Sequence, residues 1–167
     1  MGNVILIGFM GSGKTTVGLR LSYRLRQSVI DMDKEIEREE KRTISDIFAV
    51  EGEAYFRERE TACLQKLIRT VSNQIISAGG GLPLREENRK LLRRLGKVFY
   101  LRADAETIYE RLKGDTTRPL LQGSDPKTKI RTLMGQRDAC YMDAADVVIQ
   151  VDGKSFEQII DEIEAQV

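Results

Sequence analysis

The stretch that decides the fold is residues 8–15, which read Gly8-Phe9-Met10-Gly11-Ser12-Gly13-Lys14-Thr15. This stretch satisfies the pattern GxxxxGK[ST], the phosphate-binding P-loop. An apolar run, Val4–Ile7, precedes it, and apolar residues then recur with helical spacing at Val17, Leu21 and Leu25. A strand, a glycine-rich turn and a helix in this order are the context that the motif requires. The same context argues against the structural alternative, a glycine-rich turn that merely precedes a helix.

The residue types of the motif suit the phosphates of a nucleotide. Glycines let backbone N–H groups surround the phosphates, and the N-terminus of the following helix adds the positive end of its dipole. Lys14 provides a point charge for the β- and γ-phosphates, and Thr15 offers a hydroxyl to Mg²⁺. The sequence therefore predicts an enzyme that transfers the γ-phosphate of ATP. The residues expected to hold the nucleotide at this loop are Gly11, Ser12, Gly13, Lys14, Thr15 and Thr16.

Short β-branched runs alternate with segments of helical periodicity, which is typical of an α/β fold with a mostly parallel sheet. Each run is apolar nearly throughout, which favours strands covered on both faces. Helices are expected from about Glu53 to Thr70 and after Ser155, whose hydroxyl can cap a helix together with Gln158. With no repeat and no linker, the 167 residues fit one domain, 1–167. The expected strands are Val4–Ile7, Val29–Asp31, Gln74–Ser77, Val98–Leu101 and Val147–Val151.

Two stretches interrupt the alternation of strands and helices. Residues from about 33 to 61 contain two helical pieces before the next strand. Residues 114–126 contain Gly114, Pro119, Gly123 and Pro126 among polar residues, a composition typical of a loop. Because insertions over an α/β core commonly carry function, we expect a substrate site in the first stretch and a lid in the second.

The overall composition limits the partners and the chemistry. The chain has 27 basic and 26 acidic residues, a net charge of +1, which argues against nucleic acid or an anionic membrane as the main partner. It contains no histidine, and Cys63 and Cys140 are isolated, which argues against zinc sites and histidine-based catalysis. Two isolated thiols fit a reducing cytoplasm. We expect a monomer, because no exposed apolar stripe is evident.

Two carboxylates, Asp31 and Asp33, stand at the end of the second expected strand. Alternate residues of a strand point the same way, so both can face the site beside the P-loop. Asp31 is suited to holding the metal through its water, and Asp33 to orienting or deprotonating an acceptor hydroxyl. For Asp33 the alternative is a structural one, in which it caps a helix that starts near Lys34.

An arginine and a run of glycines follow. Arg57 has Glu53 four residues before it and Glu60 three residues after it, so acids on its own helix face can fix its guanidinium. Composition alone favours a solvated face for this stretch. Residues 79–81 are three consecutive glycines after a strand, which costs backbone entropy and indicates a place where a ligand approaches the backbone. A plain tight turn would need only one or two glycines.

Taken together and in order, the motifs of this chain resemble those of the shikimate kinase family, and the resemblance covers nearly the whole chain. The motifs are GFMGSGKTTVG, DMD, GEAYFRERE, SAGGGL, RPLL and the later pair Arg137 and Tyr141. The resemblance implies transfer of the γ-phosphate of ATP to the 3-hydroxyl of shikimate, which gives 3-phosphoshikimate and ADP in aromatic amino-acid biosynthesis. It implies one Mg²⁺ per subunit. It also implies a three-layer α/β/α P-loop fold like that of the nucleoside monophosphate kinases, with a lid and a five-stranded parallel sheet in the order 2-3-1-4-5.

The resemblance also implies roles for single residues. Asp33 would take the hydroxyl proton, Arg118 in the lid would swing onto the phosphates, and Arg111 would stack on adenine. Asp31 and Thr15 would serve Mg²⁺. The catalytic residues implied are Lys14, Asp33 and Arg118. The acceptor pocket implied consists of Asp33, Arg57, Gly79, Gly80, Gly81 and Arg137.

The chain departs from the family pattern in two places. Relatives often have Arg-x-Pro-Leu-Tyr where residues 137–141 read Arg-Asp-Ala-Cys-Tyr, and residues 151–155 lack the proline often found in the adenine loop. The rival interpretations are a kinase for gluconate or a nucleoside monophosphate, and a GTPase-type switch protein. Two carboxylate-binding arginines suit a small anionic acceptor better than a nucleobase. The chain also has no NKxD-like guanine reader and no LSGGQ.

Overall fold

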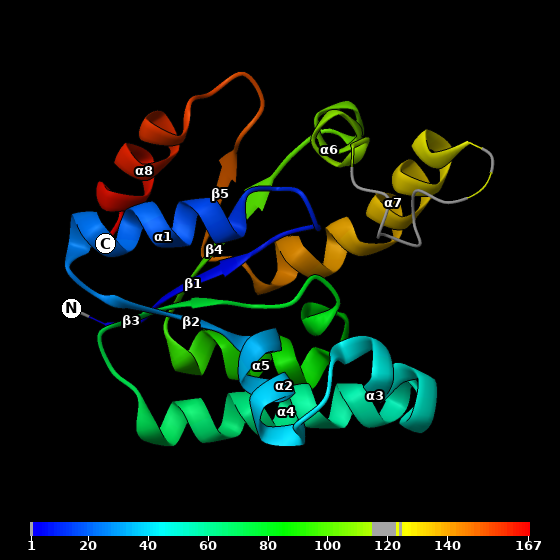
Figure 1. The fold of residues 1–167 in the computed structure, drawn as a ribbon. Coiled ribbons are helices and arrows are strands. Elements are labelled where there is room, and N and C mark those ends of the chain that lie inside the picture. The colour runs from blue at the N-terminus through cyan, green and yellow to red at the C-terminus, as the bar shows by residue number, and fades with distance from the viewer. Residues whose placement is uncertain (1, 115–122, 124) are drawn as a thin grey trace.

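All five strands of the sheet run parallel in this computed structural model, which describes residues 2–114, 123 and 125–167. The strand order is β2-β3-β1-β4-β5, as expected (Figure 1). The carboxyl ends of the strands therefore meet at one edge of the sheet, where α/β folds place their sites. The strands are β1 (Val4–Ile7), β2 (Ser28–Asp31), β3 (Gln74–Ser77), β4 (Lys97–Arg102) and β5 (Val147–Gln150).

Helices cover both faces of this sheet and form the three layers that were predicted (Figure 1). On one face α1 packs beside α8, and on the other α4 packs against α5. α7 contacts both α5 and α6. None of the helices in the described part of the chain is long and apolar enough to cross a membrane. The helices are α1 (Lys14–Leu25), α2 (Met32–Glu40), α3 (Ile44–Glu51), α4 (Glu53–Thr70), the 3₁₀ turn η1 (Leu82–Leu84), α5 (Glu86–Leu95), α6 (Ala105–Leu112), α7 (Pro126–Ala144) and α8 (Phe156–Glu164).

Burial falls from the centre of the sheet to its edges. All four residues of β1 are buried, as the apolar pattern predicted. The prediction that every strand is covered on both faces is wrong for β2, where Ser28 and Val29 are exposed, and for β5, where Val148 is exposed. These two strands form the edges of the sheet and have a neighbour on one side only. Position in the sheet, more than composition, therefore decides how far a strand is buried.

The two interrupting stretches have different outcomes. The insertion expected at about 33–61 contains most of α2, all of α3 and the first turns of α4. The expected lid at 114–126 lies mainly outside the described residues, and Arg118 lies outside them entirely. What the structure does describe there is the start of α7 at Pro126.

The start of α8 has the capping box that the sequence predicted. The Ser155 hydroxyl accepts a hydrogen bond from the Gln158 backbone N–H at 3.2 Å, and the Gln158 side chain accepts one from the Ser155 N–H at 2.8 Å. Ile159, Ile160 and Ile163 are buried on the inner face of the helix. The cap therefore fixes the point at which the chain enters its last helix.

Removing the Ser155 hydroxyl should destabilise the protein. Ser155→Ala should lower the free energy of unfolding by about 1 kcal/mol, because the Gln158 backbone N–H loses its acceptor, whereas Ser155→Gly should cost only a few tenths. Urea denaturation followed by circular dichroism measures both variants. Equal losses from the two substitutions would contradict the capping role.

Candidate functional site

The P-loop joins β1 to α1. Gly8 ends the strand with φ +153°, and Gly13 caps α1 with φ +103°. The Lys14 ammonium donates to the backbone oxygens of Gly8 at 2.6 Å and Phe9 at 3.2 Å, so the side chain folds back over the loop. The N-terminus of α1 opens toward the same space, which gives the positive pole expected of a phosphate site.

The backbone angles of this loop favour glycine, and the space around it is tight as well. A Cβ at Gly11 would lie 3.1 Å from the Leu112 side chain, and one at Gly13 would lie 3.1 Å from Arg111 Nη1. Both glycines also have φ in the left-handed region, at +79° and +103°. The loop therefore packs tightly against α6, which lies above it.

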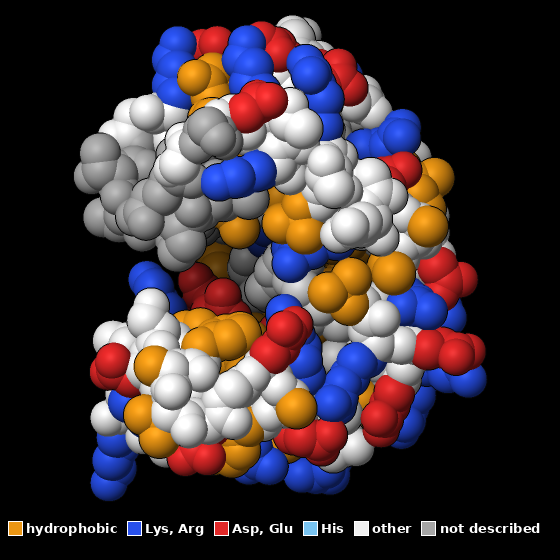
Figure 2. All heavy atoms as spheres, turned by 90° about the vertical axis from the view of Figure 1, so that its right-hand side faces the viewer, with side chains coloured by type: hydrophobic (Ala, Val, Ile, Leu, Met, Phe, Trp, Pro, Cys, Tyr) orange, Lys and Arg blue, Asp and Glu red, His pale blue; other side chains and the backbone are white. Residues whose placement is uncertain are grey.

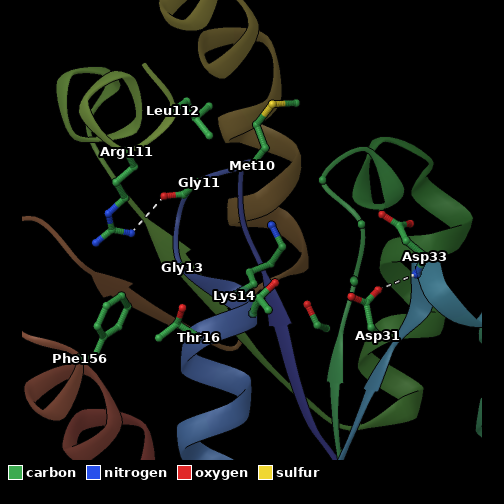
Figure 3. Close-up of a pocket in the computed structure, with 15 residues that line it drawn as sticks. Met10, Gly11, Gly13, Lys14, Thr16, Asp31, Asp33, Arg111, Leu112 and Phe156 are labelled. Carbon is green, nitrogen blue, oxygen red and sulfur yellow. Dashed lines mark hydrogen bonds between the residues drawn. The ribbon is translucent and has the colours of Figure 1, made fainter. Parts of the chain in front are cut away.

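A cavity of about 380 Å³ opens beside the loop, at the carboxyl ends of the strands. Figure 3 shows Lys14 near its centre, Arg111 and Phe156 on one side, and Asp31 and Asp33 on the other. Ten predicted site residues line it: Gly11, Gly13, Lys14, Thr15, Thr16, Asp31, Asp33, Gly79, Gly80 and Arg111. Five residues that sequence reasoning did not assign to the site also line it: Met10, Ser77, Ala78, Leu112 and Phe156.

The remaining predicted residues lie elsewhere. Ser12 is buried inside the loop, and its Oγ has no hydrogen-bond partner among the described residues. Three further predicted residues, Arg57, Gly81 and Arg137, do not line the cavity itself. Gly81 follows Gly79 and Gly80, which do line it, and the side chains of Arg57 and Arg137 lie close to these glycines. Arg118 cannot be placed, because it lies outside the described residues.

One end of the cavity is built from a cation and an aromatic ring. Arg111 donates from Nη1 to the Gly11 backbone oxygen at 3.1 Å, and its Cζ lies 5.6 Å from the centre of the Phe156 ring (Figure 3). Phe156 is the first residue of α8. The structure shows it partly buried against the core and also lining the cavity. Periodicity could not find this role, because Phe156 is the first residue of its helix and faces both ways.

Asp31 has a structural role that the sequence analysis considered for Asp33. α2 begins at Met32, and Asp31 Oδ1 accepts hydrogen bonds from the backbone N–H groups of Asp33 at 3.0 Å and Lys34 at 3.3 Å. The capping alternative for Asp33 is therefore wrong, because Asp31 is the N-cap. The strand register puts Ser77 directly beside Asp31, and both line the cavity with Thr15. These oxygen donors have the chemistry that Mg²⁺ prefers.

The glycine segment, residues 79–81, lies within a few ångströms of charged side chains. A Cβ at Gly79 would lie 2.7 Å from Asp33 Oδ1, and one at Gly81 would lie 2.3 Å from Arg57 Nη2. None of the three glycines has a positive φ. The absence of side chains at these positions therefore allows the protein's own side chains to approach the backbone closely. Approach of a ligand to the same backbone stays a prediction.

Arg57 is fixed by its acidic neighbours, as the spacing predicted. Its Nη1 lies 2.6 Å from Glu60 Oε1 and its Nη2 lies 3.5 Å from Glu53 Oε1. The Arg57 side chain is 13% exposed and that of Glu60 only 1%, so this face of α4 is not the solvated one. The solvated face exists as well, since Glu58 and Arg59 between them are exposed.

Burial shifts the pKa values of two carboxyl groups beside the glycine segment, those of Asp33 and Glu60. Desolvation, together with the nearby charge of Asp31, raises the pKa of Asp33 above its ordinary value. Desolvation also raises the pKa of Glu60 to about 7, although Arg57 opposes the shift. Raised carboxyl pKa values beside a cavity are typical of functional sites.

Arg137 completes the group on the far side of the glycines. A Cβ at Gly80 would lie 3.5 Å from Arg137 Nη1, and the guanidinium carbon lies 5.7 Å from the centre of the Phe9 ring. The buried Nε of Arg137 has no hydrogen-bond partner in the part of the chain that is described. An unsatisfied buried donor of this kind is costly.

The surface is hollowed at this place. Figure 2 shows a recess between an upper part, where Figure 1 places α6 and α7, and a lower part formed by α2, α3 and α4. Acidic and basic side chains gather inside the recess, although the net charge of the chain is only +1. The charge needed for anion binding is therefore local.

Comparison with known proteins points to one family. The family model for shikimate kinase matches residues 10–167. A shikimate kinase from Symbiobacterium thermophilum is 44% identical over 163 residues, which cover 96% of this chain and 93% of that protein. One from Neisseria gonorrhoeae is 47% identical over 149 residues, which cover 89% and 87%. The structure of shikimate kinase from Acinetobacter baumannii in complex with shikimate has a TM-score of 0.90 and 37% identity, and the match covers 99% of this chain and 92% of that one.

The buried Glu60 makes a prediction about stability against pH. Its pKa in the fold, about 7, lies above the ordinary 4.5, so the folded state binds the proton more tightly than the unfolded chain. The stability from this group is therefore fully present below about pH 4.5 and is lost as the pH rises through about 7. Glu60→Gln should flatten the dependence of the unfolding free energy on pH across this window.

The matched control for Glu60 lies on the same helix. The Glu58 side chain is 62% exposed and pairs with Arg85 at the surface, so Glu58→Gln should leave the slope with pH unchanged. Urea titrations at several pH values compare the two variants. The same slope in Glu60→Gln as in the parent protein would contradict the proton linkage.

Proposed function

Since the chain belongs to the shikimate kinase family and transfers the γ-phosphate of ATP to shikimate, we propose that this one cavity brings the two substrates together. The phosphates lie against the P-loop and Lys14, and the acceptor hydroxyl lies at Asp33. The observation that carries this proposal is the close approach of two guanidinium groups, Arg57 and Arg137, to the glycine segment next to Asp33.

The glycine segment supports a binding mode for the acceptor carboxylate. Arg57 lies against Gly81 and Arg137 against Gly80, so the two cations approach one short stretch of backbone. Guanidinium groups suit carboxylates because they offer planar pairs of donors. The unpartnered Nε of Arg137 gives one such donor at no cost to an existing hydrogen bond. The acceptor carboxylate would neutralise this pair.

Asp33 is the group we assign to the acceptor hydroxyl. As the oxygen of the acceptor attacks the γ-phosphorus, its proton passes to the Asp33 carboxylate, the bond from the γ-phosphorus to the bridging oxygen breaks, and ADP leaves. A raised pKa makes Asp33 a better proton acceptor than an ordinary carboxylate. Lys14, now held by the loop carbonyls of Gly8 and Phe9, is close enough to turn onto the phosphates.

The metal ion and the adenine ring complete the proposed nucleotide site. We assign Mg²⁺ to Thr15 and Asp31, where its charge would neutralise the β- and γ-phosphate oxygens. The hydrogen bonds that Asp31 accepts within the described residues use Oδ1, which leaves Oδ2 as a ligand. We assign the adenine ring to the Arg111 guanidinium, on whose flat face it would stack, beside Phe156 at this end of the cavity. Arg118, carried over from the family pattern, remains the proposed lid residue.

We also propose that the enzyme works as a cytoplasmic monomer on these two small molecules, without nucleic acid or a membrane as partner. The near-neutral charge and the two free cysteines support this. The large exposed apolar side chains of the described residues are also spread over several elements, among them Leu19, Val50, Met142 and Val148.

Replacing Arg57 by lysine should weaken the binding of shikimate but not that of ATP. Arg57→Lys should raise the KM for shikimate roughly tenfold to a hundredfold, because a lost charged hydrogen bond costs about 1.5–3 kcal/mol. The KM for ATP should change little. Steady-state kinetics with each substrate varied in turn measures this, and Arg59→Lys, an exposed arginine of the same helix, is the control. An equal rise in both KM values would rule out the acceptor assignment.

Removing the proposed base should affect the chemical step. Asp33→Asn should lower kcat by about 10²–10⁴, the usual contribution of general base catalysis. In the parent enzyme the raised pKa of Asp33 means that kcat/KM should fall on acidification at a pH above the ordinary 3.8 of an aspartate. A pH profile measured on both proteins tests the two statements together. Retention of kcat in Asp33→Asn would exclude the role.

A further inference from the structure

The side chain of Tyr141 ties helix α7 to the glycine segment. Its hydroxyl donates to the Gly80 backbone oxygen at 2.6 Å, and the residue is 1% exposed. Tyr141 does not line the cavity, so it cannot act by touching a substrate there. Its hydrogen bond instead fixes the distance between α7 and the backbone beside the proposed acceptor site.

Arg137 lies one turn before Tyr141 on the same face of α7. Residues four apart on a helix are neighbours in space, so both side chains reach the glycine segment together. The position that a Cβ of Gly80 would take is 3.5 Å from Arg137 Nη1, while the Gly80 oxygen holds the Tyr141 hydroxyl. One peptide unit therefore meets both residues.

The other side of α7 is fastened to the sheet. Tyr100, on β4, donates from its hydroxyl to Asp138 Oδ1 at 2.7 Å, and Arg102 donates to both oxygens of Asp138 at 3.1 Å. The Tyr100 and Tyr141 rings also pack with their centres 5.0 Å apart. The hydrogen bonds of Asp138 and the ring contact of Tyr141 therefore attach this turn of α7 to β4.

The protonation states of these groups keep the attachments intact at neutral pH. Burial opposes ionisation of Asp138, but hydrogen bonds from Arg102 and Tyr100 outweigh it and lower the pKa of the carboxyl group. Burial raises the pKa of Tyr141, so its hydroxyl keeps the proton that it donates to Gly80.

We propose that Tyr141 is a positioning residue for the acceptor site, which sets the Arg137 guanidinium against the glycine segment by joining α7 to Gly80. Without its hydroxyl, α7 and the glycine segment can move apart while the packed ring still fills the core. The proposal rests on the acceptor role assigned above to Arg137. It concerns the binding of shikimate.

The test removes one oxygen atom. Tyr141→Phe keeps the ring against Tyr100 and should raise the KM for shikimate roughly fivefold to tenfold, with the KM for ATP within about twofold of the parent value. Tyr55→Phe is the matched control, since the Tyr55 hydroxyl also donates one short hydrogen bond, 2.7 Å to Glu40, away from the cavity. An unchanged KM for shikimate in Tyr141→Phe would overturn the proposal, as would an equal rise for both substrates.

A double-mutant cycle separates positioning from independent effects. If Tyr141 acts by placing Arg137, the double variant Tyr141→Phe with Arg137→Lys should raise the KM for shikimate by less than the product of the two single changes. Multiplication of the two effects would overturn the positioning role. A normal KM for shikimate in Arg137→Lys alone would instead contradict the acceptor assignment. An impaired Arg137→Lys beside a normal Tyr141→Phe would contradict only the role of Tyr141.

Discussion

The close approach allowed by three consecutive glycines is the constraint on which the site depends. Residues 79–81 follow a central strand, and each gives up its side chain so that a charged group can lie against the backbone. Asp33, Arg137 and Arg57 arrive from three different helices, α2, α7 and α4. A single methyl group at Gly81 would overlap the Arg57 guanidinium. The pocket that we propose for the acceptor is therefore shaped as much by the absence of side chains at these three positions as by the side chains around them.

Charge balance makes this crowding possible. Two carboxylates, Asp33 and Glu60, and two guanidinium groups, Arg57 and Arg137, lie around the glycine segment in a chain with almost no net charge. Burying a charge is costly unless a partner of opposite sign or a hydrogen bond compensates it. Glu60 compensates Arg57, but the buried Nε of Arg137 has no partner among the described residues. The cluster of these four charged side chains therefore lacks one hydrogen-bond acceptor within the described part of the chain, and we propose that the anionic substrate supplies it.

Sequence patterns predicted what local rules determine. The P-loop, the capping box at Ser155 and the Glu60 contact of Arg57 follow from short spacings, and the structure has all of them. The five strands lie where they were predicted, with ends that differ by at most one residue. The patterns failed where the outcome depends on neighbours far along the chain. They could not show that β2 is half exposed as an edge strand, or that Phe156 faces the cavity. The strand order and the acceptor residues came from the family resemblance, because no periodicity encodes them.

In our proposal Asp31 serves two purposes through its two oxygen atoms. Oδ1 accepts hydrogen bonds from the backbone N–H groups of Asp33 and Lys34 in the first turn of α2, and Oδ2 is the oxygen that we assign to the cation. An alteration at this position would therefore loosen the start of a helix and shift the neighbouring carboxylate at the same time. Loss of activity in such a variant cannot be read as loss of metal alone. The assignment of ligand and base in this enzyme has to be separated by substitutions that preserve the helix cap.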